Sequence, residues 1–471
     1  MGSTRSFRRA TALLLSTALL AFGGCALKDP PARSDLQRDA LPNAGVPPQW
    51  TGAPVAAGPP DGGWLASFDD ASLTALVAEA LTYNADLAAA AARIEQAAAS
   101  VKIAGGAILP AVDAYATGGS KLAGDASGIT GGGFRATWEI DVWGRVRYGQ
   151  RSAQDLHAST QADYEYARQS IAAMVSKAWF SALEATQQQA LARDTVTAAE
   201  GSVSLASDRL RVGVGSEVDV AVARANLASY RDNARNLEAA RVQSLRALET
   251  LLGRYPAATA QVPSQWRPMP APTAAGLPSE LLERRPDVIA AERRVAAAFD
   301  LAGEARAARL PRISLTAGVS SISSDIFVLQ NVDNPTVSFG ASLLWPLLRG
   351  GALEGVQDLR TAQQKEAVAA WARTGLRAFS EVENALANEA SLTEREQILQ
   401  AATRDAERAL QLEEVRYKVG SVDLRAVQQR RIALYSARMS LLRVQSEMRV
   451  QRVNLHLALG GSFAQPPTTR R

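Results

Sequence analysis

Few residues in this chain of 471 amino acids could carry out covalent or metal chemistry. The two histidines, His157 and His456, are far apart in segments of helix-forming composition, which disfavours a histidine-based metal site or catalytic triad. Cys25 is the single cysteine, so it forms no internal disulfide and leaves no other thiol for catalysis. No glycine-rich loop ends in Gly-Lys-Ser or Gly-Lys-Thr, the signature of a nucleotide motor. We therefore expect no enzyme activity, no cofactor and no metal site, and any energy the chain uses must come from a partner.

Cys25 follows a segment with the three parts of an export signal. Arginines come first, an apolar run covers 10–22, and two glycines precede the cysteine. An apolar run of about 13 residues is too short to cross a hydrocarbon core of ~30 Å as a helix. We therefore expect 1–24 to be a cleaved lipoprotein signal peptide. Without its three arginines the formal net charge falls from +4 to +1, which removes the electrostatic argument for nucleic-acid binding.

The residues around Cys25 resemble a bacterial lipobox, with Phe22 in place of the usual leucine. This resemblance implies acylation of the Cys25 thiol, as by palmitate, and Ala26 after it implies sorting to the outer membrane. The alternative is an ordinary cleaved signal with an incidental cysteine. The segment 25–63 is rich in Pro, Gly and Ala without apolar periodicity, so we expect an extended N-terminal tether.

The rest of the chain contains an internal duplication. Three glycines recur 207 residues later: Gly144, Gly213 and Gly253 return as Gly351, Gly420 and Gly460. Two upstream residues recur 201 residues later: Asp86 and Pro110 return as Asp287 and Pro311. The difference of six places an insertion between these blocks, in the second copy. A repeat of about 200 residues is far longer than a solenoid unit, so it predicts two equivalent halves of one fold.

Each half contains a long stretch without proline that predicts an antiparallel helical hairpin. Residues 145–212 would form a helix of ~100 Å, and 353–419 are the matching stretch. In each half a second, antiparallel helix follows the long one and ends near Gly253 or Gly460; we call it the return helix. Apolar residues recur every seven positions in the second return helix, at Val427, Leu434, Leu441, Met448 and Leu455. A strict seven-residue repeat predicts left-handed supercoiling against neighbouring helices.

The segments between the helices predict two strand hairpins. Strands are expected within about 111–142 and about 312–345, where apolar residues alternate with polar ones. Four strands are too few for a membrane barrel, which needs about eight. Their exposed edges would have to pair between copies of the chain, and three chains would supply 12 strands.

Four motifs in this order resemble those of one family. They are Trp138–Arg145 (WEIDVWGR), Gly213–Val220 (GVGSEVDV), Gly276–Val288 (GLPSELLERRPDV) with Ala291–Arg294 (AERR), and Tyr417–Gly420 (YKVG). Together they are similar to the NodT-type lipoproteins of the TolC-like outer-membrane factor superfamily, and the resemblance covers nearly all of 64–461.

The resemblance implies a mainly α homotrimer with a 12-stranded barrel in outer-membrane lipid and a helical tunnel in the periplasm. It implies a passive efflux conduit that works with a periplasmic adaptor and an inner-membrane pump of the resistance-nodulation-division class. We expect efflux repeats at 64–270 and 271–461, with long helices at about 145–253 and about 353–460 and a disordered tail at 462–471. A type I protein-secretion channel and a non-conducting structural coiled-coil lipoprotein remain as alternatives.

The breaks between the long helices are the candidate site. Glycine there permits a positive φ, and Ser216 or Ser421, with Asp219 or Asp423, can cap the start of the next helix. The resemblance implies that these turns dock the adaptor, through Gly213, Val214, Gly215, Ser216, Val419, Gly420 and Ser421. It also implies a tip gate with candidates Asp219, Arg416, Tyr417 and Asp423. Ala426 and Gln429 replace the acidic ring of some members, so we expect weaker cation selectivity.

A charged cluster begins the second repeat. Pro286 and Asp287 suit the first turn of a helix, so we interpret Asp287 as part of a helix start. Because residues two apart do not share a face of a helix, we expect no ion pair between Arg285 and Asp287.

Overall fold

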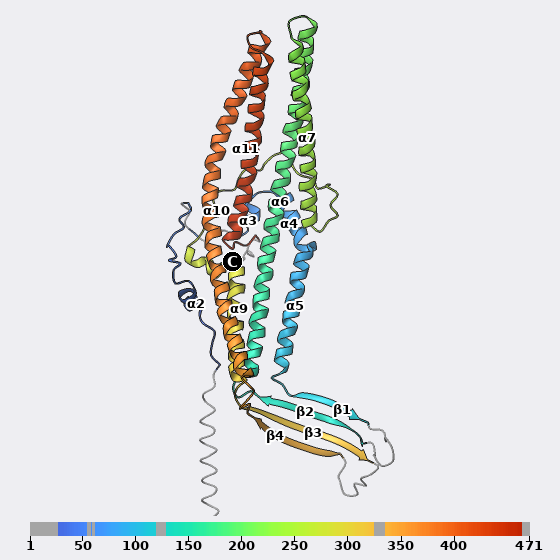
Figure 1. The fold of residues 1–471 in the computed structure, drawn as a ribbon, viewed down its shortest axis with the longest axis vertical. Helices are drawn as coiled ribbons and strands as arrows, with labels where there is room; N and C mark the ends of the chain where they lie inside the picture. The colour runs from blue at the N-terminus through green and yellow to red at the C-terminus, as the bar shows by residue number, and fades with distance from the viewer. Residues whose placement is uncertain (1–26, 54–57, 59–61, 119–128, 325–334, 464–471) are drawn as a thin grey trace, which may run out of the picture. The chain divides into compact units, whose positions relative to one another are not determined.

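The computed structural model describes residues 27–53, 58, 62–118, 129–324 and 335–463. Cys25 and the expected signal peptide lie outside these residues, as does the expected tail from 464 on. The helices are α2 (Arg33–Ala40), α3 (Trp64–Ser67), α4 (Ala71–Tyr83), α5 (Ala85–Gly106), α6 (Arg145–Arg211), α7 (Glu217–Leu251), α8 (Leu281–Arg284), α9 (Pro286–Ala307), α10 (Ala352–Lys418) and α11 (Leu424–Ala458) (Figure 1). The strands are β1 (Ala111–Thr117), β2 (Ile129–Ile140), β3 (Arg312–Ser324) and β4 (Thr336–Leu344). Within the described residues, no helix combines the length and the apolarity needed to cross a bilayer.

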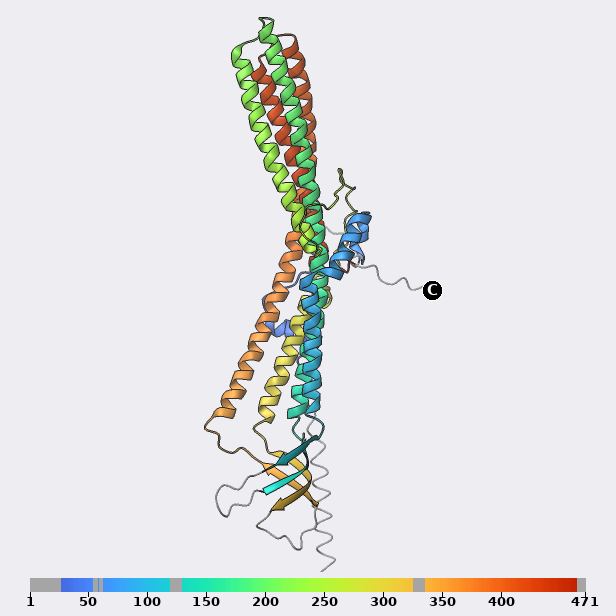
Figure 2. The same ribbon diagram turned by 90° about the vertical axis from the view of Figure 1, so that its right-hand side faces the viewer.

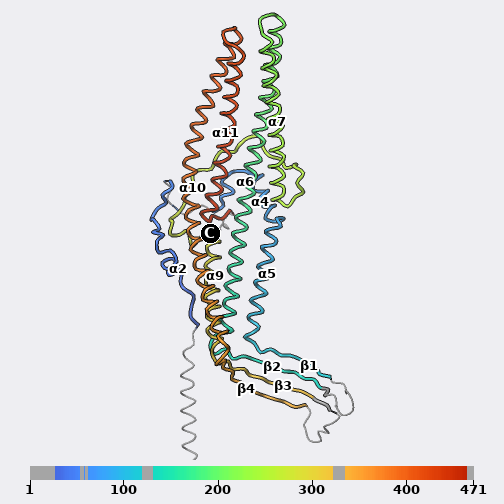
Figure 3. Tube along the Cα trace, viewed as in Figure 1, coloured from blue at the N-terminus to red at the C-terminus, as the bar shows by residue number. Residues whose placement is uncertain are grey.

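The internal repeat is confirmed element by element. The pairs α5 and α9, α6 and α10, and α7 and α11 have 22, 67 and 35 residues in both copies. All six recurring glycines have positive φ: 77°, 79° and 75° at Gly144, Gly213 and Gly253, and 79°, 78° and 69° at Gly351, Gly420 and Gly460. The chain path therefore runs twice through the same sequence of helix, strand hairpin, long helix and return helix (Figure 3).

Two compact units divide the chain. One contains the sheet and the helix segments next to it, from 92–162 and 290–373, with 27–43 of the described N-terminal residues. The other contains the two long hairpins, from 44–91, 163–289 and 374–463. The hairpin turns of α6–α7 and α10–α11 lie at the same end of this second unit (Figure 2).

The core of the second unit forms where the helices of both copies meet. Trp179 of α6 is fully buried among Trp64, Leu73 and Leu248, and its indole nitrogen donates to the Asp70 carboxylate over 2.9 Å. Four of the five heptad residues of α11 are buried, and Leu441 is half-buried. The seven-residue stripe thus packs as predicted.

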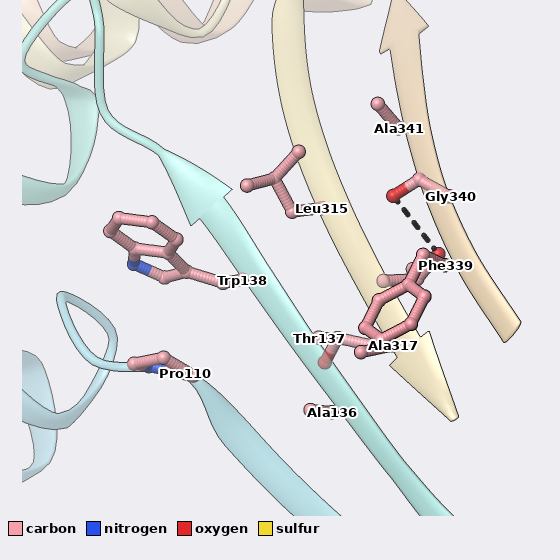
Figure 4. Close-up of a pocket in the computed structure, with 10 residues that line it drawn as sticks. Pro110, Ala136, Thr137, Trp138, Leu315, Ala317, Phe339, Gly340 and Ala341 are labelled. Carbon is pink, nitrogen blue, oxygen red and sulfur yellow. Dashed lines mark hydrogen bonds between the residues drawn. The ribbon is translucent and has the colours of Figure 1, made fainter. Parts of the chain in front are cut away.

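The four strands form one antiparallel sheet in the order β1-β2-β3-β4. Its register places apolar side chains together on one face, because residues directly opposite each other point the same way. Three rows cross this face: Val112, Ala136, Ala317 and Phe339; Ala114, Phe134, Val319 and Val337; and Trp138, Leu315 and Ala341. Figure 4 labels residues of the first and third of these rows. The other face carries polar rows such as Asp113, Arg135, Gly318 and Ser338.

The N-terminal segment differs from the extended tether expected for 25–63. Residues Arg33–Ala40 form α2, Leu36 is 4% exposed, and Arg33 pairs with Glu292 of α9 at 2.7 Å. Further along, the Trp50 indole donates to the Gly276 carbonyl over 3.0 Å. The segment therefore packs without apolar periodicity, through a few apolar and charged contacts with other parts of the chain.

Candidate functional site

The two hairpin turns have the same backbone design. At the end of α6, Gly213 donates to the Leu210 carbonyl and Val214 to the Arg209 carbonyl. Gly420 and Ser421 repeat this pattern on Tyr417 and Arg416 at the end of α10. This is the Schellman motif, in which the positive φ of glycine lets the chain satisfy the last carbonyls of a helix.

Side chains then cap the return helices at repeat-related positions. The Ser216 hydroxyl accepts from the Asp219 amide at 3.1 Å, and the Asp423 carboxylate accepts from the Ala426 amide at 3.0 Å. Of the four side chains predicted as candidate caps, Ser216 and Asp423 are the two that cap. The turns leave small apolar side chains in solvent, with Val214 62% and Val419 74% exposed.

Tyr417 joins the two hairpins at this end. It is 5% exposed and packs in a cluster with Ala206 of α6, Val220 of α7 and Leu424 of α11. The guanidinium carbon of Arg209 lies 4.9 Å from the centre of its ring, within the range of a cation–π interaction. The end of α10 is therefore held against the end of α6.

The electrostatics around Tyr417 also involve Asp219. Burial raises the pKa of the Tyr417 hydroxyl above its ordinary value; the charge of Arg209 lowers it and that of Asp219 raises it further. Of the four residues expected at the gate, Tyr417 thus contacts the other hairpin and feels the charge of Asp219, and Arg209, which was not expected there, lies over its ring. The sequence held a signal for Arg209, because it is the repeat counterpart of Arg416, 207 residues earlier.

The other two gate candidates make only local contacts. Arg416 pairs with Glu413 on its own helix at 3.4 Å and is exposed. Asp423 caps α11 and pairs with Arg425 at 3.2 Å. Both therefore stabilise a helix end and do not bridge the hairpins.

Polar side chains continue the link between the hairpins below the turns. Arg431 of α11 donates to the Ala198 carbonyl of α6 at 3.0 Å and pairs with Glu414 of α10 at 2.9 Å. The Asn233 amide of α7 donates to the Tyr435 hydroxyl of α11 at 2.6 Å. The two copies are thus joined by directional contacts as well as by apolar packing.

The expectation for Arg285 and Asp287 is wrong. The Arg285 guanidinium, 1% exposed, donates to both carboxylate oxygens of Asp287 at 3.0 and 2.8 Å. Arg285 precedes Pro286, which disfavours helical backbone, and it has extended angles of φ −75° and ψ 121°. It therefore lies outside α9, and its side chain folds back onto the first turn. The predicted helix start at Pro286 with Asp287 in the first turn is confirmed.

This pair belongs to a wider charge network. Arg285 also pairs with Glu381 of α10 at 2.7 Å and donates to the Ala458 carbonyl at the end of α11 at 3.0 Å. Arg377 of α10 pairs with Asp287 at 3.2 Å. Burial raises the pKa of the Asp287 carboxyl, but the hydrogen bond and charge of Arg285 outweigh it, so the net shift is downward. The network joins three helices of the second unit.

Comparisons with known proteins agree with this architecture. The family model described as outer membrane efflux protein matches residues 76–254 and 277–461, one match in each copy of the repeat. The pyoverdine export outer membrane protein OpmQ of Pseudomonas aeruginosa is 31% identical over 96% of this chain and 97% of its own length. The cation efflux system protein CusC of Escherichia coli is 28% identical over 96% of this chain and 99% of its own.

Solved structures extend the likeness to the fold. The open state of the Neisseria gonorrhoeae MtrE outer membrane channel has a TM-score of 0.80 at 26% identity, over 94% of this chain and 99% of that one. The helices, sheet and repeat of this chain are those of TolC-like channels, which are conduits and not an enzyme family. The chain belongs to the outer membrane efflux protein family and is the outer-membrane channel component of an efflux system.

Proposed function

We propose that three copies of the chain form a passive conduit through the outer membrane. The amphipathic sheet is the observation that carries this proposal. One face has only apolar side chains in its three central rows, and large ones are well exposed, with Phe339 at 84% and Val112 at 68%. The opposite face carries charges and hydroxyls. This pattern suits a barrel with lipid outside and water inside.

Closure of the barrel would require neighbouring copies. Strands β1 and β4 are the two edges of the sheet, and each leaves a row of backbone groups unpaired along one side. Edges of this kind are stabilised by pairing with another chain. Three copies joined β4 to β1 would give the 12 strands expected from the sequence.

Acylation of Cys25 is part of the proposal, and the position of the residues that follow it is compatible with a membrane anchor. The Lys28 amide donates to the Tyr148 hydroxyl over 3.0 Å, and a Cβ built on Gly144 would lie 2.3 Å from the Leu27 side chain. These contacts hold the chain beside the point where α6 leaves the sheet. An acylated Cys25 would then enter the membrane next to the apolar face.

The hairpin turns are the proposed docking surface for the periplasmic adaptor, and an inner-membrane pump of the resistance-nodulation-division class would supply the energy. Both turns present an exposed valine beside a rigid Schellman turn, Val214 and Val419. Rigid backbone with a small apolar anchor lowers the entropy cost of binding a partner. The cargo would be small molecules; pyoverdine and cations are what the names of the two relatives specify.

Opening of the tunnel tip would require the two hairpins of each chain to move apart. The contact of Arg209 with the Tyr417 ring opposes that movement and would favour the closed tip. A cation–π contact is worth about 0.5–2 kcal/mol, so its loss should shift the opening equilibrium toward the open tip by roughly two- to thirtyfold per chain.

Conductance of purified protein in planar bilayers tests both parts of the proposal. Wild-type protein should conduct, and Arg209→Ala should conduct more. Arg416→Ala is the matched control, because this repeat counterpart pairs only within its own helix, and it should behave as wild type. No conductance from any variant would favour a structural coiled-coil lipoprotein. Equal conductance of Arg209→Ala and Arg416→Ala would show that Arg209 does not stabilise the closed tip.

A further inference from the structure

The two junctions between sheet and long helix differ in length. Four residues, 141–144, connect β2 to α6, whereas seven residues, 345–351, connect β4 to α10. The six extra residues of the second copy are therefore divided between this connection and the strand hairpin. The longer connection places Leu347 and Leu348 in solvent, 76% and 89% exposed.

The first junction satisfies its own polar groups. The Asp141 carboxylate accepts from the Val146 and Arg147 amides at 3.0 and 2.9 Å, which caps the first turn of α6. Glu139 forms a bidentate salt bridge with Arg145, with hydrogen bonds of 3.0 and 2.8 Å. The positive charges and free amides at this helix start are thus matched by carboxylates.

The second junction has an open cavity of about 310 Å³. Within the described residues, its positive charges are not paired with carboxylates as they are in the first junction. Arg309 and Arg349 line it and form no ion pair with any described carboxylate; Arg309 donates only to the Gln357 amide oxygen at 2.7 Å. Among the described side chains, none accepts from the first-turn amides of α10, and of these amides that of Ala352 donates to the Arg349 carbonyl over 3.0 Å. Glu354 is the one carboxylate in the lining, so two guanidinium groups and a positive helix end face one acid.

The rest of the lining is apolar and continues from the sheet. Trp345 is 58% exposed, and it follows β4, where Leu343 of the apolar face is 69% exposed. Tryptophan and arginine are the residues that occupy the headgroup level of a membrane. A ligand for this cavity must combine a negative charge with apolar chains.

We propose that this cavity binds an anionic phospholipid of the membrane leaflet next to the helices. Arg309, Arg349 and the Leu353 and Glu354 amides of α10 contact the phosphate, and Leu347 and Leu348 lie among the acyl chains. The inference rests on the proposed placement of the apolar sheet face in lipid. It gives the second junction a lipid contact that the first, with its internal caps, does not have.

Native mass spectrometry of delipidated oligomer in detergent tests the site. Phosphatidylglycerol should bind more tightly than phosphatidylcholine of the same chain length. The double variant Arg309→Gln/Arg349→Gln should weaken phosphatidylglycerol binding roughly ten- to hundredfold, since charge-assisted hydrogen bonds are lost. Arg306→Gln is the matched control; this exposed arginine is one turn away on α9 and outside the cavity, and it should bind as wild type.

Three results would overturn the inference: equal binding of the two lipids, equal weakening by Arg306→Gln, or displacement of phosphatidylglycerol by inorganic phosphate at comparable concentrations. A double variant that dissociates the oligomer but keeps its lipid affinity would instead make this cavity an interface between copies.

Fluorescence separates failure of the site from failure of the proposed function. In vesicles, brominated phosphatidylcholine should quench Trp138, measured as the difference between wild type and Trp138→Phe. Quenching without lipid selectivity would overturn the site alone. Absence of quenching and of conductance would overturn the membrane placement, and the lipid site with it.

Discussion

In both copies a helix begins beside the end of a return helix: α5 beside the end of α7, and α9 beside the end of α11. We call this place the corner, and its side chains differ between the two copies. In the first, the Asn84 amide donates to the Leu251 carbonyl at the end of α7, and its oxygen accepts from the Asp86 and Leu87 amides. In the second, Arg285 takes the place of Asn84 and donates to Ala458, the counterpart of Leu251. At equivalent positions, a neutral amide in the first copy and a buried cation in the second thus donate to the carbonyl at the end of the return helix.

The glycines at these corners are constrained by the same neighbours. A Cβ on Gly253 would lie 2.6 Å from the Tyr83 carbonyl oxygen, and one on Gly460 would lie 3.2 Å from the carbonyl oxygen of Arg284, the counterpart of Tyr83. The backbone of the corner is therefore similar in the two copies, while its side chains differ. The charged copy also connects to α10, through Arg377 and Glu381.

The largest expected difference between the corners comes from Asp287→Asn. This change leaves the Arg285 guanidinium buried without one of its charged partners, and breaking a buried pair costs about 3–5 kcal/mol. The counterpart Asp86→Asn affects an exposed residue and should cost less than about 1 kcal/mol. Urea unfolding in detergent measures both free energies. Equal values would mean that the charge network adds nothing to the corner.

Acid should destabilise the two copies over different pH windows. His456 and its counterpart Glu249 are 2% and 1% exposed. Burial and the charge of Arg452 lower the pKa of His456 to about 3 from 6.5. Because the unfolded chain binds this proton first, stability should fall as the pH drops from 6.5 toward 3, by on the order of 1 kcal/mol per pH unit.

Glu249 acts at lower pH. Burial raises its pKa, but hydrogen bonds from the amides of Ala258, Thr259 and Ala260 outweigh it, so the net shift is downward. Its stabilisation is present above about pH 4.5 and is lost as the pH falls through the lowered pKa. His456→Gln should therefore flatten the stability curve between pH 6.5 and 4.5 and leave the fall below it. An unchanged slope in that variant would show that other groups govern acid sensitivity.

A smaller loss than that of Asp287→Asn is expected for Asn84→Ala in the first corner. The change removes a helix cap and the donor to the Leu251 carbonyl, so we expect a loss of about 1–2 kcal/mol. Asn84→Ser supplies the matched comparison, since its hydroxyl can still cap the helix but the amide that donates to the Leu251 carbonyl is lost. Thermal unfolding followed by tryptophan fluorescence should rank wild type above Asn84→Ser and Asn84→Ala lowest. An unfolding midpoint for Asn84→Ala equal to that of wild type would show that the contact of Asn84 with Leu251 does not stabilise the first corner.

Much of the fold was predictable because its signals are local. The positive φ of Gly213 and Gly420 follows from glycine at a helix end, and the Ser216 and Asp423 caps follow from oxygen-bearing side chains before a helix. The candidate site was predictable in part. Tyr417 was identified by resemblance, whereas Arg209, which lies over its ring, was missed because it comes from another hairpin.

Two other departures have different origins. The Arg285–Asp287 pair is local, and the sequence carries its signal: Pro286 keeps Arg285 out of the helix, so helical spacing does not apply to it. The packing of α2 has no local signal, because its one buried apolar residue, Leu36, gives no periodicity.

The sequence by itself determined the duplication, the helix lengths and the turns, because these depend on backbone preferences of a few adjacent residues. The tertiary structure alone decided which distant groups meet, such as the Arg209 guanidinium with the Tyr417 ring across the copies and the Arg285 guanidinium with the Ala458 carbonyl within the second copy. Such contacts join segments some 170 to 210 residues apart, so they follow from the path of the folded chain and from the burial it imposes.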